Sequence, residues 1–336
     1  FVKDPAEGDY GCKILHDPVD AVVDIIFVHG LTGSRRNTWT KKWTIGKQTV
    51  ACFWPEHLLP INIENARIST WGYDADVVDP KLFHMVSNNS ITEHAANLCT
   101  EVAHLRSETK TVSIVSLEDR FKDCFNAWEA WCALLHASEA GSDDVSHIRD
   151  VYESTRGILF MGTPHEGSSH AKLGGILSSI VGLVKKTNKD IVKALTENAR
   201  PLVDLQERFF RLLGTRRDQG QALYITCCFE ELDIPMIGTI VTRSSATLAG
   251  YEAIGIHANH TDMTKFSASD SPGYTKVVGE LQRWVKNLDY KKDEKGQSAK
   301  NEIHHHGDNK DSATALYGNQ NISGTTTFGN ATRQDL

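Results

Sequence analysis

Two residues in the second half of the chain have the types and positions needed for acyl-transfer chemistry. Glu230 directly follows the apolar segment 222–229, and His260 follows a later segment of the same kind. In this chemistry an imidazole takes the proton of a nucleophile, and a carboxylate holds the imidazole in the right tautomer. A single Glu or His after a strand is usually a solvated loop residue, so the pair needs support from elsewhere in the sequence.

A glycine turn near the N-terminus could supply a further part of such a site. The apolar run 25–28 predicts a strand buried on both faces, and His29, Gly30 and Leu31 follow it. Glycine lets the backbone turn sharply and leaves peptide N–H groups accessible. Such donors can receive the oxyanion that forms during acyl transfer, although an ordinary glycine turn would have the same sequence.

The elements that must position these residues alternate between strands and helices. Ser90 is predicted to cap a helix whose buried stripe includes Ala95, Leu98 and Val102. A helical region is predicted over 173–213, interrupted at Pro201, and could form a cap over the sheet. A last helix is predicted to end near Asp289. The order of the elements predicts an α/β protein with a doubly wound, mainly parallel sheet. The predicted strands are 22–28, 66–71, 157–161, 222–229 and 237–241.

Composition limits the class of protein. With 336 residues, of which 40% are hydrophobic and 24% charged, the chain can bury one large core. The formal charge of −7 argues against nucleic acid as the main partner. Apolar runs stay short of the ~18 residues of a membrane span, so no transmembrane segment is expected. The tryptophans of the stretch 39–54 are expected to serve packing.

The cysteines and one sequon bear on location. Seven cysteines at scattered spacings, without a C-x-x-C pair, indicate free thiols in a reducing compartment. The sequon 259–261 would place a glycan directly on His260 in the secretory pathway. We therefore expect an intracellular, cytoplasmic protein. The chain starts at Phe1 without a signal-like segment, so its true N-terminus is expected to lie further upstream.

Five separated phrases occur in an order that resembles a known family. The family is that of the fungal lipase-like serine hydrolases allied to the GPI inositol-deacylase group, which often head NLR-type proteins or act as their partners. The resemblance implies an α/β-hydrolase fold over residues 21–290 and hydrolysis of acyl or lipid esters without a cofactor. The phrases that carry it are 27–31, 69–74, 157–168, 228–232 and 257–266.

The resemblance also implies roles for individual residues. His29, Gly30 and Leu31 would belong to the oxyanion turn, Glu230 would be the triad acid and His260 the triad base. Asp262 is the alternative acid, and His165 is expected to shape the site rather than react. No metal is expected, because the cluster 304–306 looks disordered and His257 and His260 lack partners at ligand spacing.

The nucleophile region departs from the family pattern. The family places a G-x-S-x-G or His-Ser-Leu-Gly-Gly elbow upstream of Gly157, and the chain has no G-x-S-x-G. Ser116 is the one remnant of a Ser-Leu pair, but Glu118 and Asp119 replace the small residues that the strained turn needs. Two classes of function therefore stay open: an active hydrolase, or a catalytically inactive hydrolase fold used for binding or signalling.

A misread sequence is a further explanation for this departure. Read two bases forward, the codons of Asn126 to Cys132 can encode Cys-Leu-Gly-Gly-Leu-Val, with Cys or Arg at the nucleophile position. Trp128 and Trp131 each have a single codon, so part of this result depends little on codon choice. A diverged loop is the alternative, and the transcript sequence over residues 106–135 distinguishes the two.

The two ends of the chain differ in character from the middle. Residues 1–20 are predicted to be a polar lead-in, and residues 291–336 a disordered linker and tail with too few apolar residues for a core. Within the tail, residues 312–332 carry no charge and alternate β-formers with Asn, Gln and Gly. This pattern is typical either of a disordered polar end or of an amyloid-like motif that self-assembles or joins an NLR-type partner.

Overall fold

The computed structural model describes seven stretches of the chain. They are residues 10–29, 34–73, 88–107, 111–118, 126–141, 143–165 and 199–288. Contacts divide the chain into two units, Phe1–Lys286 and Asn287–Leu336, and the second is described only at its first two residues. Gly30, Leu31, Asp119, the greater part of the predicted cap and the whole of the segment 312–332 lie outside the described residues.

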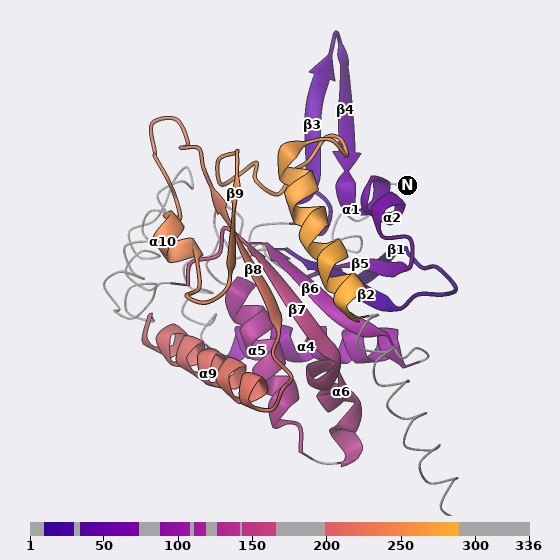
Figure 1. The fold of residues 1–336 in the computed structure, drawn as a ribbon, viewed down its shortest axis with the longest axis vertical. Coiled ribbons are helices and arrows are strands. Elements are labelled where there is room, and N and C mark those ends of the chain that lie inside the picture. The colour runs from indigo at the N-terminus through magenta and orange to yellow at the C-terminus, as the bar shows by residue number, and fades with distance from the viewer. Residues whose placement is uncertain are drawn as a thin grey trace, which may run out of the picture. The chain divides into compact units, whose positions relative to one another are not determined.

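A seven-stranded sheet forms the centre of the first unit (Figure 1). All its neighbouring strands are parallel except the first pair, in which β1 runs antiparallel to β5. The prediction of a doubly wound, mainly parallel sheet is confirmed. In spatial order the strands are β1 (Gly11–His16), β5 (Ala66–Gly72), β2 (Val23–Val28), β6 (Val112–Glu118), β7 (Thr155–Met161), β8 (Tyr224–Glu230) and β9 (Glu252–Ile256).

Helices cover both faces of this sheet. On one face α4 (Asn88–Arg106), α5 (Asn126–Glu139), α6 (Ser146–Ser154) and α9 (Ala199–Asp218) share a buried core with Ile26. On the other face the helix over 272–288 lies so close to β7 that a Cβ on Gly157 would come within 2.7 Å of the Trp284 ring. The central strands are therefore covered on both faces, and every residue of β2 is buried.

Some local predictions of helices were wrong. The helix predicted to start after Ser90 begins at Asn88, so Ser90 lies within it; its predicted stripe is nonetheless buried at Ala95, Leu98 and Val102. Pro201 lies in the first turn of α9, where its missing N–H costs no helical hydrogen bond; α9 begins at Ala199, and the part of the predicted helical region before it lies outside the described residues. The remaining short helices are α1 (Trp54–His57), α2 (Leu59–Asn62), η2 (Asp143–Val145) and α10 (Arg243–Ala246).

Three strand assignments also need correction. The predicted lead-in contains β1, which pairs with β5 at the edge of the sheet. The tryptophan-rich stretch contains an unpredicted hairpin of β3 (Thr40–Ile45) and β4 (Gln48–Phe53). The predicted strand 237–241 is instead a loop, because its only pairing is an isolated bridge between Ile234 and Gly238 and its amides at Ile240 and Val241 bind a carboxylate.

Two of the three tryptophans in that stretch pack in the core as expected. Trp39 and Trp54 are fully buried and meet the ring of Phe27 edge-on, with centroids 4.8 Å and 5.1 Å away. The indole N–H of Trp54 also donates to the carbonyl of Thr264 at 2.8 Å. This cluster joins the central strand β2 to the loop that follows β9, while Trp43 is only half-buried on the hairpin.

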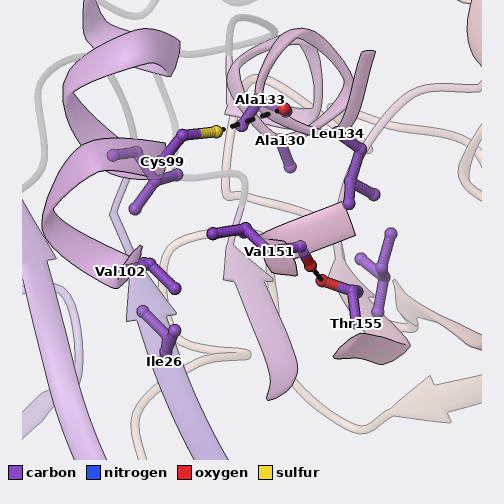
Figure 2. A pocket seen from close by; sticks show the side chains of 10 residues that line it. Ile26, Cys99, Val102, Ala130, Ala133, Leu134, Val151 and Thr155 are labelled. Atoms are coloured by element: carbon purple, nitrogen blue, oxygen red, sulfur yellow. Dashed lines mark hydrogen bonds between the residues drawn. The ribbon is translucent and has the colours of Figure 1, made fainter. Parts of the chain in front are cut away.

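A small apolar cavity lies between the sheet and the helices α4, α5 and α6 (Figure 2). Its volume is about 30 Å³, and small side chains such as Ala130 and Ala133 line part of it. The two polar side chains in view are both satisfied, since Cys99 donates to the carbonyl of Ala133 at 3.2 Å and Thr155 to that of Val151 at 2.7 Å. The cavity is thus a packing defect of the core, too small for an ester substrate.

A buried charge network ties the amino ends of the central strands together. Asp24 on β2 accepts a hydrogen bond from Arg67 on β5 at 2.7 Å and forms an ion pair with Nε of Arg106 on α4 at 3.5 Å, and all three side chains are at most 5% exposed. Thr111 donates its hydroxyl to the same carboxylate. A second donor group of Arg106 reaches the carbonyl of Thr111 at 2.6 Å. The network anchors β2, β5, α4 and the start of β6 to one another.

Replacing Asp24 by Asn should destabilise the protein strongly. The substitution removes the buried anion that Arg67 and Arg106 share, although Arg106 keeps its pair with Asp150 at 2.8 Å, and this loss costs about 3–5 kcal/mol of unfolding free energy. Chemical denaturation measures the effect. As a matched control, Glu153→Gln removes an exposed pair with Arg149 at 3.2 Å, and its cost should stay within about 1 kcal/mol. Equal losses in both variants would contradict this account of the network.

Candidate active site

The carboxyl ends of the parallel strands bring distant parts of the sequence to one edge of the sheet. His29 follows β2, Gly162 follows β7, Glu230 ends β8, and His260 lies in the loop after β9. The chain adds β5 on one side of β2 and β6 on the other, so this edge contains a topological switch point. Ligands of open α/β sheets bind in the crevice at such points.

Glu230 and His260 contact each other in the interior. The imidazole Nδ1 lies 3.1 Å from Oε2 of the carboxylate, and both side chains are 1% exposed. The other carboxylate oxygen accepts the backbone N–H groups of Ile240 at 2.6 Å and Val241 at 2.9 Å. Because main-chain donors hold one oxygen, the second is fixed in place beside the imidazole. The structure thus brings together the two residues that the sequence predicted as acid and base.

Gly162 makes room for the imidazole. Its φ is +76°, and a Cβ built there would lie 2.8 Å from Cε1 of His260 and 3.1 Å from the sulfur of Met263. Real Cβ atoms do not approach other atoms so closely, and the left-handed backbone also disfavours any side chain. The glycine that follows β7 is therefore required by the position of the His260 ring.

The loop that carries His260 is braced by its own side chains. Asn259 accepts the amide and hydroxyl of Thr261 at 3.1 Å and 2.6 Å, and the amide of Asp262 at 3.2 Å. Asp262, the alternative acid, is 41% exposed and pairs with Lys41 at 3.3 Å and Lys265 at 3.5 Å. The structure therefore places Glu230, and not Asp262, beside the imidazole.

His29 is buried against an aromatic side chain. Its ring stacks on that of Tyr73, with centroids 4.8 Å apart and planes 5° from parallel. The backbone N–H of Tyr73 donates to Nε2 of His29 at 3.4 Å. This contact orients the residue that precedes the glycine turn, whereas Gly30 and Leu31 lie outside the described residues.

His165 is embedded in the core rather than presented to a substrate. Its ring lies edge-on to Phe160 at 4.7 Å and 3.6 Å from the thiol of Cys227, while its backbone N–H donates to Ser245 at 2.6 Å. Burial lowers the pKa of His165 from 6.5 to about 3. Because the unfolded chain binds this proton and the folded chain does not, acidification from pH 6.5 toward 3 favours unfolding.

Ser116 lies within β6, between two neighbouring strands. Its Cα pairs with Phe27 of β2 and with Leu159 of β7, and the strand continues to Glu118. A nucleophile elbow is a turn between a strand and the following helix, and here α5 begins at Asn126. The intervening residues 119–125 lie outside the described part, but their sequence, DRFKDCF, holds one thiol and no hydroxyl side chain. A serine-based motif does not predict this Cys124.

From Ala130 onward, α5 contributes several buried side chains to the core. Trp131 is fully buried, and its indole stacks on the ring of Phe209 from α9 with centroids 5.1 Å apart. The segment 108–156 thus supplies the central strand β6 and the helices α5 and α6. Whether the reading frame over 126–132 is the true one stays a prediction.

The chain has the α/β-hydrolase fold. The mainly parallel sheet is covered by helices on both faces, and an acid and then a histidine follow its last two strands in the chain order of that class. Among the described residues, no group of three or more His, Cys, Asp or Glu side chains could hold a metal ion. In the same part of the chain, no helix is long and apolar enough to cross a membrane.

Comparisons with known proteins give distant similarities. No family model matches the chain. It is 22% identical over 288 residues to the mouse protein SERAC1. The aligned region covers 80% of this chain but only 40% of the length of SERAC1.

Solved structures are also similar at low sequence identity. One, from work on the metagenome-derived lipolytic enzymes LipS and LipT, has 9% identity, covers 83% of this chain and 98% of its own, and has a TM-score of 0.42. The thioesterase RedJ of Streptomyces coelicolor has 10% identity, coverages of 79% and 88%, and a TM-score of 0.36. A putative epoxide hydrolase from Pseudomonas aeruginosa has 10% identity, covers 83% of this chain and 96% of its own, and has a TM-score of 0.36.

Substituting Gly162 by Ala should displace the His260 ring. The new methyl group overlaps the imidazole, so the ring should move relative to Glu230 and the NMR signal of its Nδ1 should shift or disappear. Gly220→Ala is the matched control, because Gly220 has a similar φ of +70° but nothing within 4 Å of a Cβ. Both variants should lose about 1–2 kcal/mol of stability to backbone strain. An unchanged Nδ1 signal in Gly162→Ala would show that the ring does not need this glycine.

Proposed function

We propose that this protein hydrolyses carboxylic esters, with acyl or lipid esters as its substrate class, through a covalent acyl-enzyme. The observation that carries the proposal is the buried contact between Glu230 and His260 at 3.1 Å, at the edge of an α/β-hydrolase sheet. Water is largely excluded from this pair, so the carboxylate acts on the imidazole with little screening. Two distant similarities, to a lipolytic enzyme and to a thioesterase, agree with ester-type chemistry.

The proposed residues divide the reaction among them. Nε2 of His260 takes the proton of the nucleophile as it attacks the ester carbonyl, and returns the proton to the leaving alcohol when the C–O bond breaks. Glu230 keeps the Nδ1 proton in place and stabilises the imidazolium between these steps. Backbone N–H groups of the turn after His29 receive the oxyanion. Water then attacks the acyl-enzyme with the same histidine as base.

The nucleophile is assigned to the segment between β6 and α5. Within it, Cys124 is the side chain with a thiol, and a thiol beside a histidine is a workable nucleophile. Ser116 is the alternative, although it belongs to the strand rather than to the turn. The strained elbow usually relies on small neighbours, and here Phe125 and Asn126 follow Cys124.

Removing the base should abolish hydrolysis without unfolding the protein. His260→Ala should lose activity toward a p-nitrophenyl ester, and Glu230→Gln should lose about 10⁴-fold because the acid sets the tautomer. Both variants should remain folded, with a circular-dichroism spectrum like that of the parent, although breaking a buried pair lowers their thermal midpoints. His257→Ala is the matched control, since His257 forms a similar pair with Glu231 at 3.4 Å but is 74% exposed. Activity retained in His260→Ala would remove the assignment.

Two further variants locate the nucleophile. Cys124→Ala should abolish both hydrolysis and labelling by a thiol-directed acylating probe, whereas Ser116→Ala should retain both. Ser113→Ala, on the same strand, controls for a general effect on β6. Loss in Ser116→Ala together with labelling by a fluorophosphonate would assign the serine instead. Activity retained in both variants would contradict the proposed location.

A second candidate function is favoured by the altered nucleophile region. Glu118 and Asp119 stand where the family has small residues, as expected for a hydrolase fold that has lost catalysis. Such a chain would act as a binding module in NLR-type signalling in the cytoplasm, with the uncharged segment 312–332 as its self-assembling partner motif. A wild-type protein that neither hydrolyses esters nor takes either probe would favour this function over the first.

A further inference from the structure

The hairpin of β3 and β4 projects away from the domain (Figure 1). It forms a separate two-stranded sheet, and its strands are joined by a tight turn at Gly46, whose φ is +62°. Only its base is buried, at Thr40, Cys52 and Phe53, whereas every residue of the described segment 41–51 is half-buried or exposed. An isolated two-stranded hairpin is only marginally stable in water, so an exposed one invites a functional explanation.

The two faces of the hairpin differ in chemistry. Trp43 pairs across the strands with Val50, and alternation places Ile45 on the same face. Ile45 is 62% exposed, and Trp43 and Val50 are half-buried. The opposite face carries Lys42, which pairs with Ala51, and the pair of Thr44 and Thr49, whereas Gln48 pairs with Ile45 on the first face. The hairpin is thus amphipathic beyond the part that packs on the domain.

Its charge is opposite to that of the whole chain. The protein has a formal charge of −7, yet the segment 40–53 contains Lys41, Lys42 and Lys47 and no acidic residue. Lys42 and Lys47 are exposed, on the body and at the tip of the hairpin. A cationic element with an exposed apolar face combines the two features by which peripheral segments bind anionic lipid surfaces.

The base of the hairpin is joined to the loop that carries His260. Lys41 pairs with Asp262 at 3.3 Å, and Thr264 donates its hydroxyl to the carbonyl of Thr38 at 3.2 Å. The indole of Trp54, directly after β4, donates to the carbonyl of Thr264 at 2.8 Å. A surface bound by the hairpin is therefore connected to the histidine loop through a short set of contacts, of which the two hydrogen bonds of Thr264 are buried.

We propose that the β3–β4 hairpin is a docking element for an anionic lipid bilayer. Trp43 and Ile45 would enter the interface, where tryptophan is favoured, while Lys42 and Lys47 contact the headgroups. The exposed apolar residues favour a bilayer over nucleic acid, which is bound chiefly through its phosphates. Docking itself does not depend on catalysis; only its use, to present lipid esters to the site, rests on the proposed function.

Vesicle sedimentation tests the docking. The full-length protein should bind vesicles of phosphatidylcholine with about 30% phosphatidylserine, and should bind pure phosphatidylcholine far more weakly. Replacing Lys42 and Lys47 together by Gln should weaken binding by about 25-fold, roughly fivefold for each lysine. Ile45→Ser should weaken it as well, and raising the salt to about 0.5 M should reduce the electrostatic part.

Matched variants keep the test specific. Lys13→Gln removes an exposed lysine of β1, and Val19→Ser an exposed apolar residue, and neither should change binding. All variants should keep the parent's thermal midpoint and its activity toward a soluble ester. If the parent hydrolyses no ester, the proposed function fails while vesicle binding still decides the docking.

Three outcomes would overturn the docking proposal. The first is a parent protein that ignores anionic vesicles, and the second is a lysine double variant that binds them as tightly as the parent. The third is a different occupant: lysine-dependent binding to duplex DNA or RNA in place of vesicles, or a dimer in sedimentation velocity that Ile45→Ser dissociates.

Discussion

The contact between Glu230 and His260 sets the strictest demand on this structure. A carboxylate and an imidazole that are both 1% exposed lose their hydration, so the protein must replace it with fixed partners. It does so with the amides of Ile240 and Val241 on one side. On the other side, Gly162 leaves the ring its place. The loops after β7, β8 and β9 are each shaped by this one pair.

The amino ends of the strands also hold buried charges that are compensated by fixed partners. Asp24 and its two guanidinium partners are buried, and each charge is compensated within the fold. A central strand such as β2, buried on both faces, can carry a charged residue only under that condition. The two edges thus hold the sheet in register from both ends, while the apolar middle of the strands supplies most of the core.

The loop after β9 connects the β3–β4 hairpin to the Glu230–His260 pair. That loop carries His260, is braced by Asn259, and is contacted by the base of the β3–β4 hairpin through Lys41 and Trp54. The projecting, cationic β3–β4 hairpin and the buried Glu230–His260 pair are thus both in contact through the loop after β9.

The sequence by itself predicted the parallel sheet and the amphipathic helices, because apolar periodicity is a property of neighbouring residues. Through the resemblance to a known family it also named Glu230 and His260, which the structure brings into contact. It missed β1 and the β3–β4 hairpin, whose strands are short and only partly buried. It also assigned a strand to 237–241, where tertiary structure instead directs two amides to Glu230. Only the folded structure could show that Gly162 accommodates the imidazole, and that Asp262 pairs with lysines rather than with the histidine. These outcomes depend on contacts between residues far apart in the chain, which no local pattern encodes.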